Sequence, residues 1–264
     1  MRALVVLMLG CGCRLGFDEH AASPDAGVTM VAHDEDGDGV DDASDGCPHL
    51  AGTQTDRDND GVGDACDPNP DTPIDRIAMF DGFAHANAAW TWSGAAAPAF
   101  VGDALVVDTT GDRPLIGSLP ATATGDDLYL VGGRVTNLGS GQQMIALGYV
   151  RGPVFPDLGT STTSYYCELC AGGACGDVPF LSFTYTYNNS IFTHVDQQNL
   201  GALAPSNFVF TTRRTAGSVV CSTTLPANAT STGGVPATIA ADVIGLNLKN
   251  LVIELHYFLH IRSS

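Results

Sequence analysis

Residues 34–67 repeat one aspartate-rich pattern of 12 residues, and the second copy begins 22 positions after the first. The copies read DEDGDGVDDASD (34–45) and DRDNDGVGDACD (56–67). In both, carboxylates occupy positions 1, 3, 5, 9 and 12, glycine occupies position 6 and valine occupies position 7. Alternate aspartates on a tightly turning chain converge on one point, and the glycine permits the turn through positive φ. The pattern therefore predicts two metal loops.

Ca²⁺ suits such loops because it accepts about six to eight oxygen ligands in a flexible shell. The residue at position 7 supplies its backbone carbonyl while its apolar side chain points inward. The predicted ligands are Asp34, Asp36, Asp38, Val40, Asp42 and Asp45 in the first loop and Asp56, Asp58, Asp60, Val62, Asp64 and Asp67 in the second. An EF-hand has glutamate at position 12 and a helix on each side. Here position 12 is aspartate and the flanking segments are too short, or too broken by glycine and proline, to form helices.

The doubled pattern, with one cysteine accompanying each copy, resembles a pair of thrombospondin type 3 repeats over residues 33–70. The resemblance implies that each repeat wraps Ca²⁺ with little regular secondary structure, and that Cys47 pairs with Cys66. A disordered acidic linker would have a similar composition, but the spacing, the glycines and the cysteines favour folded repeats. A module as small as residues 33–72 cannot form a hydrophobic core. Bound metal and a disulfide would stabilise it in place of a core. We therefore expect the calcium to be a structural brace.

The negative charge of the chain is concentrated in this module. Residues 33–72 carry 13 acidic side chains and a single basic one, Arg57, which accounts for −12 of the net charge of −18. The only lysine is Lys249, so the sequence contains no polybasic patch. This distribution argues against nucleic acid and an anionic lipid surface as main partners and favours cations.

The first residues resemble an export signal. Arg2 precedes an apolar run that is too short to cross a bilayer but is typical of a signal peptide. Small residues before Cys11 and Cys13 resemble a bacterial lipobox, in which the cysteine becomes lipidated. Choosing Cys13 leaves six cysteines for disulfides, whereas choosing Cys11 leaves an odd number. We expect a signal with lipobox at 1–12 and a flexible tether at 13–32; an ordinary, non-lipidated signal is the alternative.

From residue 74 to residue 264 the sequence predicts an all-β domain. Short runs of Val, Ile, Thr, Phe and Tyr alternate with turn residues, which is typical of an antiparallel β-sandwich or jelly roll. In the last strand, period two predicts that Leu251, Ile253, Leu255, Tyr257, Leu259 and Ile261 share one face and that Val252, Glu254, His256, Phe258 and His260 share the other.

Four segments (79–83, 90–94, 102–107 and 126–135) are similar to strands of concanavalin A-like (LamG-like) jelly rolls. That superfamily includes lectins, adhesive modules and glucanases. A glucanase needs two glutamates close together on one strand, whereas Glu168 and Glu254, the two glutamates of this domain, are far apart in the sequence. No nucleophile triad stands out either, so the sequence does not favour an enzyme.

Two further groups of residues bear on the sandwich. Trp90 and Trp92 lie on one face of one predicted strand and either stack on sugar rings or belong to the core. In an exported chain, Cys167, Cys170, Cys175 and Cys221 favour disulfides over a zinc site. Of three possible connectivities, the short turn between Cys170 and Cys175 favours that pair together with Cys167–Cys221.

These features together predict a calcium-binding lipoprotein of the outer membrane or cell surface. Its lipid anchor, tether and calcium-braced spacer would present a β-sandwich that binds a glycan or a surface protein, with no nucleic-acid partner. One alternative is a secreted carbohydrate-active enzyme with a non-standard carboxylate pair. A second is a purely structural protein of the envelope.

Overall fold

The computed structural model describes residues 33–120, 126–150, 163–187, 190–215, 217–234 and 243–263. The predicted signal segment, both lipidation candidates (Cys11 and Cys13) and the tether lie outside these ranges. Within them, no helix is long and apolar enough to cross a membrane. The one helical element described is a single 3-10 turn at Gly173–Cys175.

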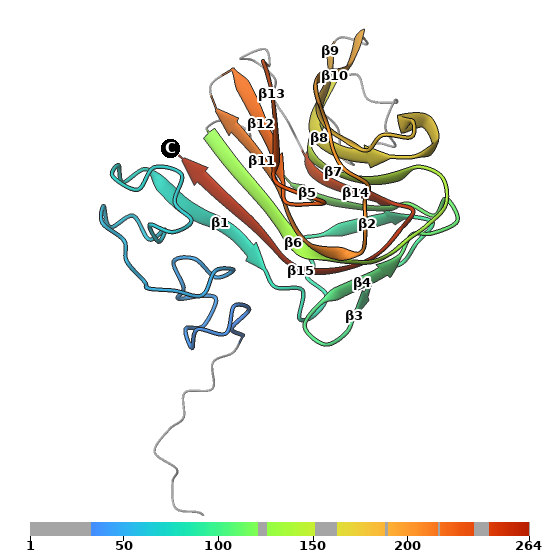
Figure 1. Ribbon diagram of the computed structural model, residues 1–264. Helices are drawn as coiled ribbons and strands as arrows, with labels where there is room; N and C mark the ends of the chain where they lie inside the picture. Colours follow the sequence, from blue (N-terminus) through green and yellow to red (C-terminus); the bar gives the residue numbers. More distant parts are fainter. Residues whose placement is uncertain are drawn as a thin grey trace, which may run out of the picture. The chain divides into compact units, whose positions relative to one another are not determined.

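The described strands form two antiparallel sheets, which confirms the predicted all-β sandwich (Figure 1). The strands of the eight-stranded sheet are β1 (Asp75–Asp81), β3 (Ala99–Phe100), β4 (Leu105–Asp108), β6 (Asp126–Leu138), β11 (Ser206–Thr215), β12 (Ser218–Thr223), β13 (Ala229–Gly234) and β15 (Leu251–Ser263). The strands of the seven-stranded sheet are β2 (Thr91–Gly94), β5 (Leu115–Pro120), β7 (Gln143–Val150), β8 (Thr163–Ala171), β9 (Phe180–Tyr187), β10 (Ser190–Asn199) and β14 (Val243–Lys249).

Strand order shows the repeated crossing typical of a jelly roll. The eight-stranded sheet runs β13-β12-β11-β6-β15-β4-β3, with β1 also paired to β15, and the seven-stranded sheet runs β10-β9-β8-β7-β14-β5-β2. Late strands thus lie between early ones: β14 separates β5 from β7, and β15 separates β6 from β4 and β1. Each sheet becomes continuous only when β14 or β15, the last strands of the chain, pairs between earlier strands. The contacts that hold the sandwich are therefore largely non-local.

One large apolar core fills the space between the sheets. It includes Leu105 and Val131 of the eight-stranded sheet and Ile145 and Leu147 of the seven-stranded sheet, all fully buried or nearly so. The Cys167–Cys221 disulfide joins β8 of one sheet to β12 of the other. The Cys170–Cys175 disulfide closes the turn after β8. The structure therefore has the connectivity that the sequence favours.

The tryptophan pair belongs to this core. Trp90 is 6% exposed, its ring stacks on Trp92 at a centroid distance of 4.8 Å, and it meets Phe258 edge-on at 5.1 Å. Its indole N–H donates to Asp81 Oδ2. Trp92 packs partly buried against the same core. The structure thus favours the core alternative, because Trp90 is buried among aromatic side chains and Trp92 stacks on it.

The predicted face pattern of the last strand is wrong beyond Leu255. The register of β15 against β6 slips between Leu255 and Tyr257, so His256 forms a β-bulge. After a one-residue slip every side chain changes face. Phe258 consequently joins Leu255 in the core between the sheets, whereas Leu259 and Ile261 point to the outer side.

Two glycines of β6 accommodate this bulge. A Cβ atom at Gly133 would lie 2.1 Å from the carbonyl oxygen of Glu254, and one at Gly132 would lie 2.2 Å from the ring of Tyr257. No side chain fits at either distance, so the Gly132-Gly133 pair is required where the bulged strand and the Tyr257 ring press on β6.

Candidate calcium centre and the adjoining pocket

The two aspartate loops have the same internal geometry. Asp34 accepts the N–H groups of Gly37 and Gly39 on its two oxygens, at 2.8 and 2.9 Å, and Asp56 bonds the equivalent positions of the second loop. Gly39 and Gly61, the position-6 glycines, have φ of 93° and 95°. The predicted turn through positive φ is therefore confirmed, and the position-1 carboxylates close it.

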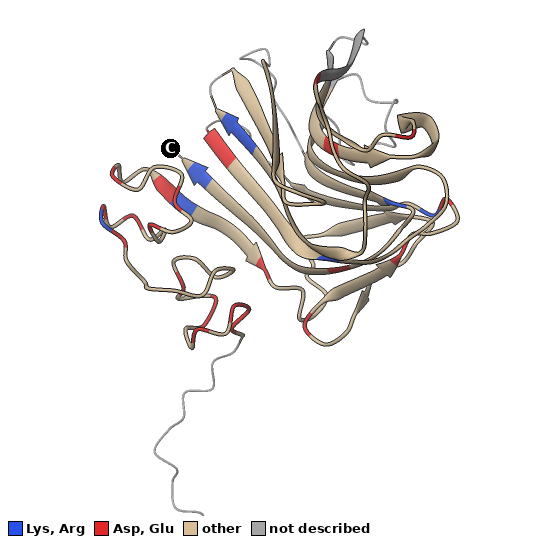
Figure 2. Ribbon diagram, in the orientation of Figure 1, with Lys and Arg blue, Asp and Glu red and all other residues tan. Residues whose placement is uncertain are grey.

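Carboxylates at positions 1, 3 and 5 converge in each loop. One oxygen each from Asp34, Asp36 and Asp38 lie within 4.8 Å of one another, and Asp56, Asp58 and Asp60 form the matching group. Acidic residues crowd along these loops and are sparse on the strands (Figure 2).

The position-3 aspartates, Asp36 and Asp58, show whether the loops suit a cation. Asp36 Oδ2 and both oxygens of Asp58 are buried and accept no hydrogen bond from the described residues. Burial, followed by the neighbouring carboxylates, raises the pKa of Asp58, and burial likewise raises the pKa of Asp36. Buried carboxylate oxygens without donors are costly unless a cation binds them. All-oxygen ligation of this kind suits Ca²⁺.

The position-9 aspartates do not join these groups. Asp42 Oδ1 accepts the N–H of Glu35, and Asp42 Oδ2 accepts a hydrogen bond from His33 Nδ1. Asp64 accepts the backbone N–H and the Nε–H of Arg57, at 3.0 and 2.9 Å. In both loops the position-9 aspartate therefore accepts the backbone N–H of the residue at position 2. The sequence pattern predicts that this aspartate is a calcium ligand.

A third carboxylate group includes a residue that the 12-residue pattern does not contain. Oxygens of Asp60, Asp67 and Asp75 lie within 4.8 Å of one another. Asp75 is the first residue of β1 and is only 4% exposed, and its backbone N–H donates to Asp60 Oδ2 at 2.7 Å. Asp67 Oδ2 is buried without a donor; burial, then the nearby Asp75 and Asp60, raise the pKa of Asp67 to about 7. In both loops the position-12 aspartate accepts the N–H two residues further on, Asp45 from Cys47 and Asp67 from Asn69. Among the described residues, only Asp67 also lies in a group of three carboxylates.

The second loop also packs on the sandwich through an apolar cluster, here called the junction cluster. Val62 is fully buried against Leu259 and Ile261, the residues that the bulge turns outward. Partly buried members of the cluster are Cys66, Ile77, Phe80, Leu128 and Leu130. The prediction that position 7 points its side chain inward is thus confirmed for Val62, while Val40 is only partly buried. The Cys47–Cys66 disulfide links the two repeats as the resemblance implies.

His49 makes a further contact between the repeats and the sandwich. Its ring lies 5.0 Å from that of Tyr257 on β15, and its Nδ1 is buried without a hydrogen-bond partner among the described residues. Burial lowers the pKa of His49 from 6.5 to about 4. The folded state therefore holds this imidazole neutral.

Acid is expected to weaken this contact through His49. The unfolded chain takes up a proton near pH 6.5 and the folded chain only near pH 4, so the free energy of unfolding falls as the pH drops through this window, by up to about 3 kcal/mol. His49→Phe keeps the aromatic packing and removes the proton site. Urea unfolding at pH 7 and pH 4.5 should show a smaller pH effect in this variant, whereas exposed His85→Asn should behave like the native chain. Equal pH slopes in the native chain and His49→Phe would contradict the assignment.

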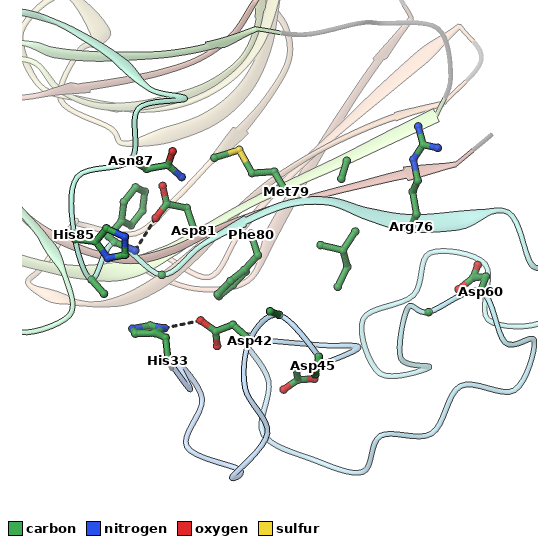
Figure 3. A pocket seen from close by; sticks show the side chains of 18 residues that line it. His33, Asp42, Asp45, Asp60, Arg76, Met79, Phe80, Asp81, His85 and Asn87 are labelled. Carbon is green, nitrogen blue, oxygen red and sulfur yellow. Dashed lines mark hydrogen bonds and ion pairs between the residues drawn. The ribbon is translucent and has the colours of Figure 1, made fainter. Parts of the chain in front are cut away.

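A pocket of about 630 Å³ lies between β1 and the two loops. Its lining on the loop side includes His33, Asp42 and Asp45, and on the sandwich side it runs along β1 from Arg76 to Asp81. Figure 3 shows Phe80 pointing toward the first loop, while Met79 points to the other side of the strand. In the part of the chain that the structure describes, β1 pairs only with β15, so the pocket follows the open edge of this strand.

The acidic residues of this pocket are already engaged. The carboxylates accept hydrogen bonds on both oxygens in Asp42, Asp60 and Asp81, and on one oxygen in Asp45. A glycosidase needs one carboxyl group as acid and a second as nucleophile or base. Asp42, Asp45 and Asp60 bond groups that hold the loops, and Asp81 bonds the backbone of Phe83 and the indole of Trp90.

The comparisons with known proteins identify the repeats. Residues 32–54 and 55–76 each match the thrombospondin type 3 repeat family, so this part of the chain consists of two such calcium-binding repeats. The match reaches beyond residue 72 and takes in Asp75. No curated protein sequence matches the chain.

Solved structures share the fold of the sandwich. The carbohydrate recognition domain of Emp47p has a TM-score of 0.50 at 8% identity, over 67% of this chain and 90% of that one. The Ca²⁺/Man3GlcNAc-bound exoplasmic/lumenal domain of VIP36 has a TM-score of 0.48 at 13% identity, over 67% and 84%. A legume lectin-like domain from Entamoeba histolytica has 0.48 at 10%, over 67% and 91%. At these identities the likeness shows a lectin-like jelly-roll fold alone.

Proposed function

We propose that the chain is an exported calcium-binding protein whose sandwich binds a glycan in the pocket along β1. The pocket itself is the observation that carries this proposal. At about 630 Å³ it falls within the range of small-ligand sites, roughly 300–1,000 Å³. The Emp47p carbohydrate recognition domain shares the fold, which supports a glycan as the ligand class.

The lining suits a sugar because polar groups flank apolar surface. Arg76 and His85 are exposed and border the pocket, and Asn87 lies near Met79 and Asp81 (Figure 3). Guanidinium, imidazole and amide groups donate hydrogen bonds to hydroxyl oxygens, while Phe80 offers surface to the apolar side of a sugar ring.

Calcium would affect this pocket indirectly, by holding the loops that form one of its walls. The loop residues that line it, Asp42 to Asp45 and Asp60 to Gly61, are held by the turns that the cation groups close. In this proposal the ion does not touch the glycan; it keeps one wall of the pocket in place. Glycan binding would therefore require calcium.

The cellular setting is part of the proposal. Lipidation of Cys13, or of Cys11, would anchor the chain at the outer membrane or cell surface, and residues 13–32 would serve as the tether. The calcium repeats and the sandwich would then face the surrounding medium, where calcium and glycans are available. Secretion without an anchor is the alternative.

Glycan-array binding of the chain with and without calcium tests the proposal. We expect a glycan that binds only with calcium, and Arg76→Ala and His85→Ala should each lower its affinity by about tenfold, the effect of losing one hydrogen bond to a charged or polar group. Arg134→Ala removes the same charge from an exposed site on β6, outside the pocket, and should bind normally.

Three outcomes would overturn this function. An array that stays blank in calcium would remove the glycan as ligand. Hydrolysis of a bound glycan would establish the carbohydrate-active enzyme in its place. Undiminished binding by both Arg76→Ala and His85→Ala would move the site away from β1.

A further inference from the structure

A second pocket, of about 460 Å³ and here called the histidine pocket, lies where the first aspartate loop meets the sandwich. Three separate segments of the chain line it. His33 and Glu35 come from the start of the loop, Asp103 from the turn between β3 and β4, and His256 from the bulge of β15. None of these four residues belongs to the predicted calcium ligands. Two imidazoles and two carboxylates therefore border one cavity.

The position-9 aspartate of the first loop orients two of these groups. An ionised carboxylate only accepts hydrogen bonds, so the proton shared by Asp42 Oδ2 and His33 Nδ1 comes from the imidazole (Figure 3). In the neutral ring, Nε2 then carries the lone pair. The same aspartate accepts the backbone N–H of Glu35 on Oδ1 at 2.9 Å. A histidine that binds a metal usually donates its other N–H to a carboxylate in this way.

The distance between the first two groups suits a shared metal ion. His33 Nε2 lies 3.9 Å from Glu35 Oε2, which is too far for a hydrogen bond. Two ligands that are each about 2.1 Å from one zinc ion can be up to about 4.2 Å apart. The Glu35 side chain is 12% exposed and accepts no hydrogen bond from the described residues. A Cβ atom at Gly82 would lie 2.5 Å from the His33 ring and 3.2 Å from Glu35 Oε2, so this glycine makes room for the pair.

The second loop has the same backbone turn without these donors. In each loop the position-9 N–H donates to the carbonyl of the residue before position 1, which is His33 in the first loop and Thr55 in the second, at 2.9 and 2.8 Å. Arg57 occupies the place of Glu35 in the second loop and bonds the position-9 carboxylate of Asp64. The first loop therefore lacks a fixed positive charge at the point where the second loop has one.

Asp103 and His256 complete the pocket from the sandwich side. Asp103 is exposed and His256 is half-buried, and neither side chain makes a hydrogen bond or an ion pair with another described residue. Both can therefore turn toward an ion. From this geometry we infer that the histidine pocket binds a divalent transition-metal ion of the zinc type. Its ligands are His33 Nε2 and the side chains of Glu35, Asp103 and His256.

Zinc accounts for these four groups better than a charge pair or calcium does. A charge pair would use His33 and Asp42 alone, and would leave the carboxylates of Glu35 and Asp103 at one cavity without a cation. Calcium takes oxygen ligands, so it would leave both imidazoles unused. Zinc binds imidazole nitrogen and carboxylate oxygen alike. The chain would thus hold two kinds of metal at separate sites.

Zinc titration of the calcium-loaded chain tests this site without any glycan. Isothermal titration in excess calcium keeps the aspartate loops occupied, and we expect one zinc ion to bind without releasing calcium. Zinc should shift the imidazole NMR signals of His33 and His256 and leave those of His49 and His85 in place. His256→Gln should lower the zinc affinity by about a hundredfold, because a direct ligand is lost.

A double variant gives the first loop the residues of the second. His33→Thr with Glu35→Arg should abolish zinc binding and retain calcium binding, because Arg57 makes the equivalent contact with the position-9 carboxylate of the second loop. Asp177→Asn is the matched control for Asp103→Asn. It changes an exposed aspartate that does not line the histidine pocket, and should bind zinc like the native chain.

If the double variant fails to fold, His256→Gln and the NMR shifts of the native chain still decide the matter. The inference is overturned if no zinc binds in excess calcium, or if zinc binds only by displacing calcium. It is equally overturned if His256→Gln binds zinc as tightly as the native chain does.

Discussion

Removal of calcium by excess EGTA is expected to unfold residues 33–72 and to uncover the outer face of β15 while the two sheets stay paired. The position-3 carboxylates and Asp67 have buried oxygens without donors, so the repeats lose their main stabilising interaction. Each site contributes about 2.7 kcal/mol when free calcium is a hundred times its Kd. The core between the sheets contains no residue of the repeats and keeps its Cys167–Cys221 disulfide.

Calorimetry should therefore show two transitions, of which chelation removes or lowers only the first. Once Val62 leaves, Leu259 and Ile261 become an exposed apolar patch, so binding of the dye ANS should rise in EGTA and fall when calcium is restored. Magnesium in place of calcium serves as the control for ionic strength and charge. A single transition that chelation shifts as a whole would contradict this prediction and show that repeats and sandwich unfold together.

The second large effect is expected from Asp75→Asn. This substitution keeps the shape of a buried side chain that accepts hydrogen bonds from Asn69 and Ser263, but it removes one charge from the group with Asp60 and Asp67. Calcium affinity of the second repeat should fall by about ten- to a hundredfold, the loss typical when a supporting residue of a metal site is changed. Isothermal titration with calcium measures it directly.

The sign of this effect reverses in chelator. Without a cation the three carboxylates repel, so Asp75→Asn should be at least as stable as the native chain in EGTA and less stable in calcium. Asp71→Asn is the matched control, since Asp71 is exposed and forms an ion pair with the guanidinium of Arg57 outside this carboxylate group. If Asp75→Asn binds calcium as tightly as the native chain does, Asp75 is no part of the centre.

Sequence reasoning succeeded where the determinants are local. The turn of each loop depends on an aspartate and a glycine five residues apart, so Asp34 with Gly39 and Asp56 with Gly61 could be identified from spacing alone. The short turn between Cys170 and Cys175 was sufficient in the same way, and the alternation of apolar residues predicted the strands of the sandwich.

Two features of the site depend on interactions that spacing does not encode. The position-9 residues match a ligand pattern, but Asp42 and Asp64 bond the backbone and neighbouring side chains. Asp75 lies eight residues beyond the end of the pattern, after a proline-rich segment, and joins the centre only because β1 starts there. A periodic pattern predicts which side chains surround one loop. It cannot predict a carboxylate such as Asp75, which comes from the strand that follows the loop.

The sequence by itself determined the turns of the two aspartate loops, the Cys170–Cys175 pair and the all-β class, because each follows from residues close together or from strict periodicity. Only the tertiary structure decided which face of the last strand is buried. The bulge at His256 depends on Gly133 and Glu254, residues brought together by strand pairing, and it turns Leu259 and Ile261 outward. Val62 packs on that outward face. The one-residue bulge in β15 therefore creates the apolar surface on which the calcium repeats contact the sandwich.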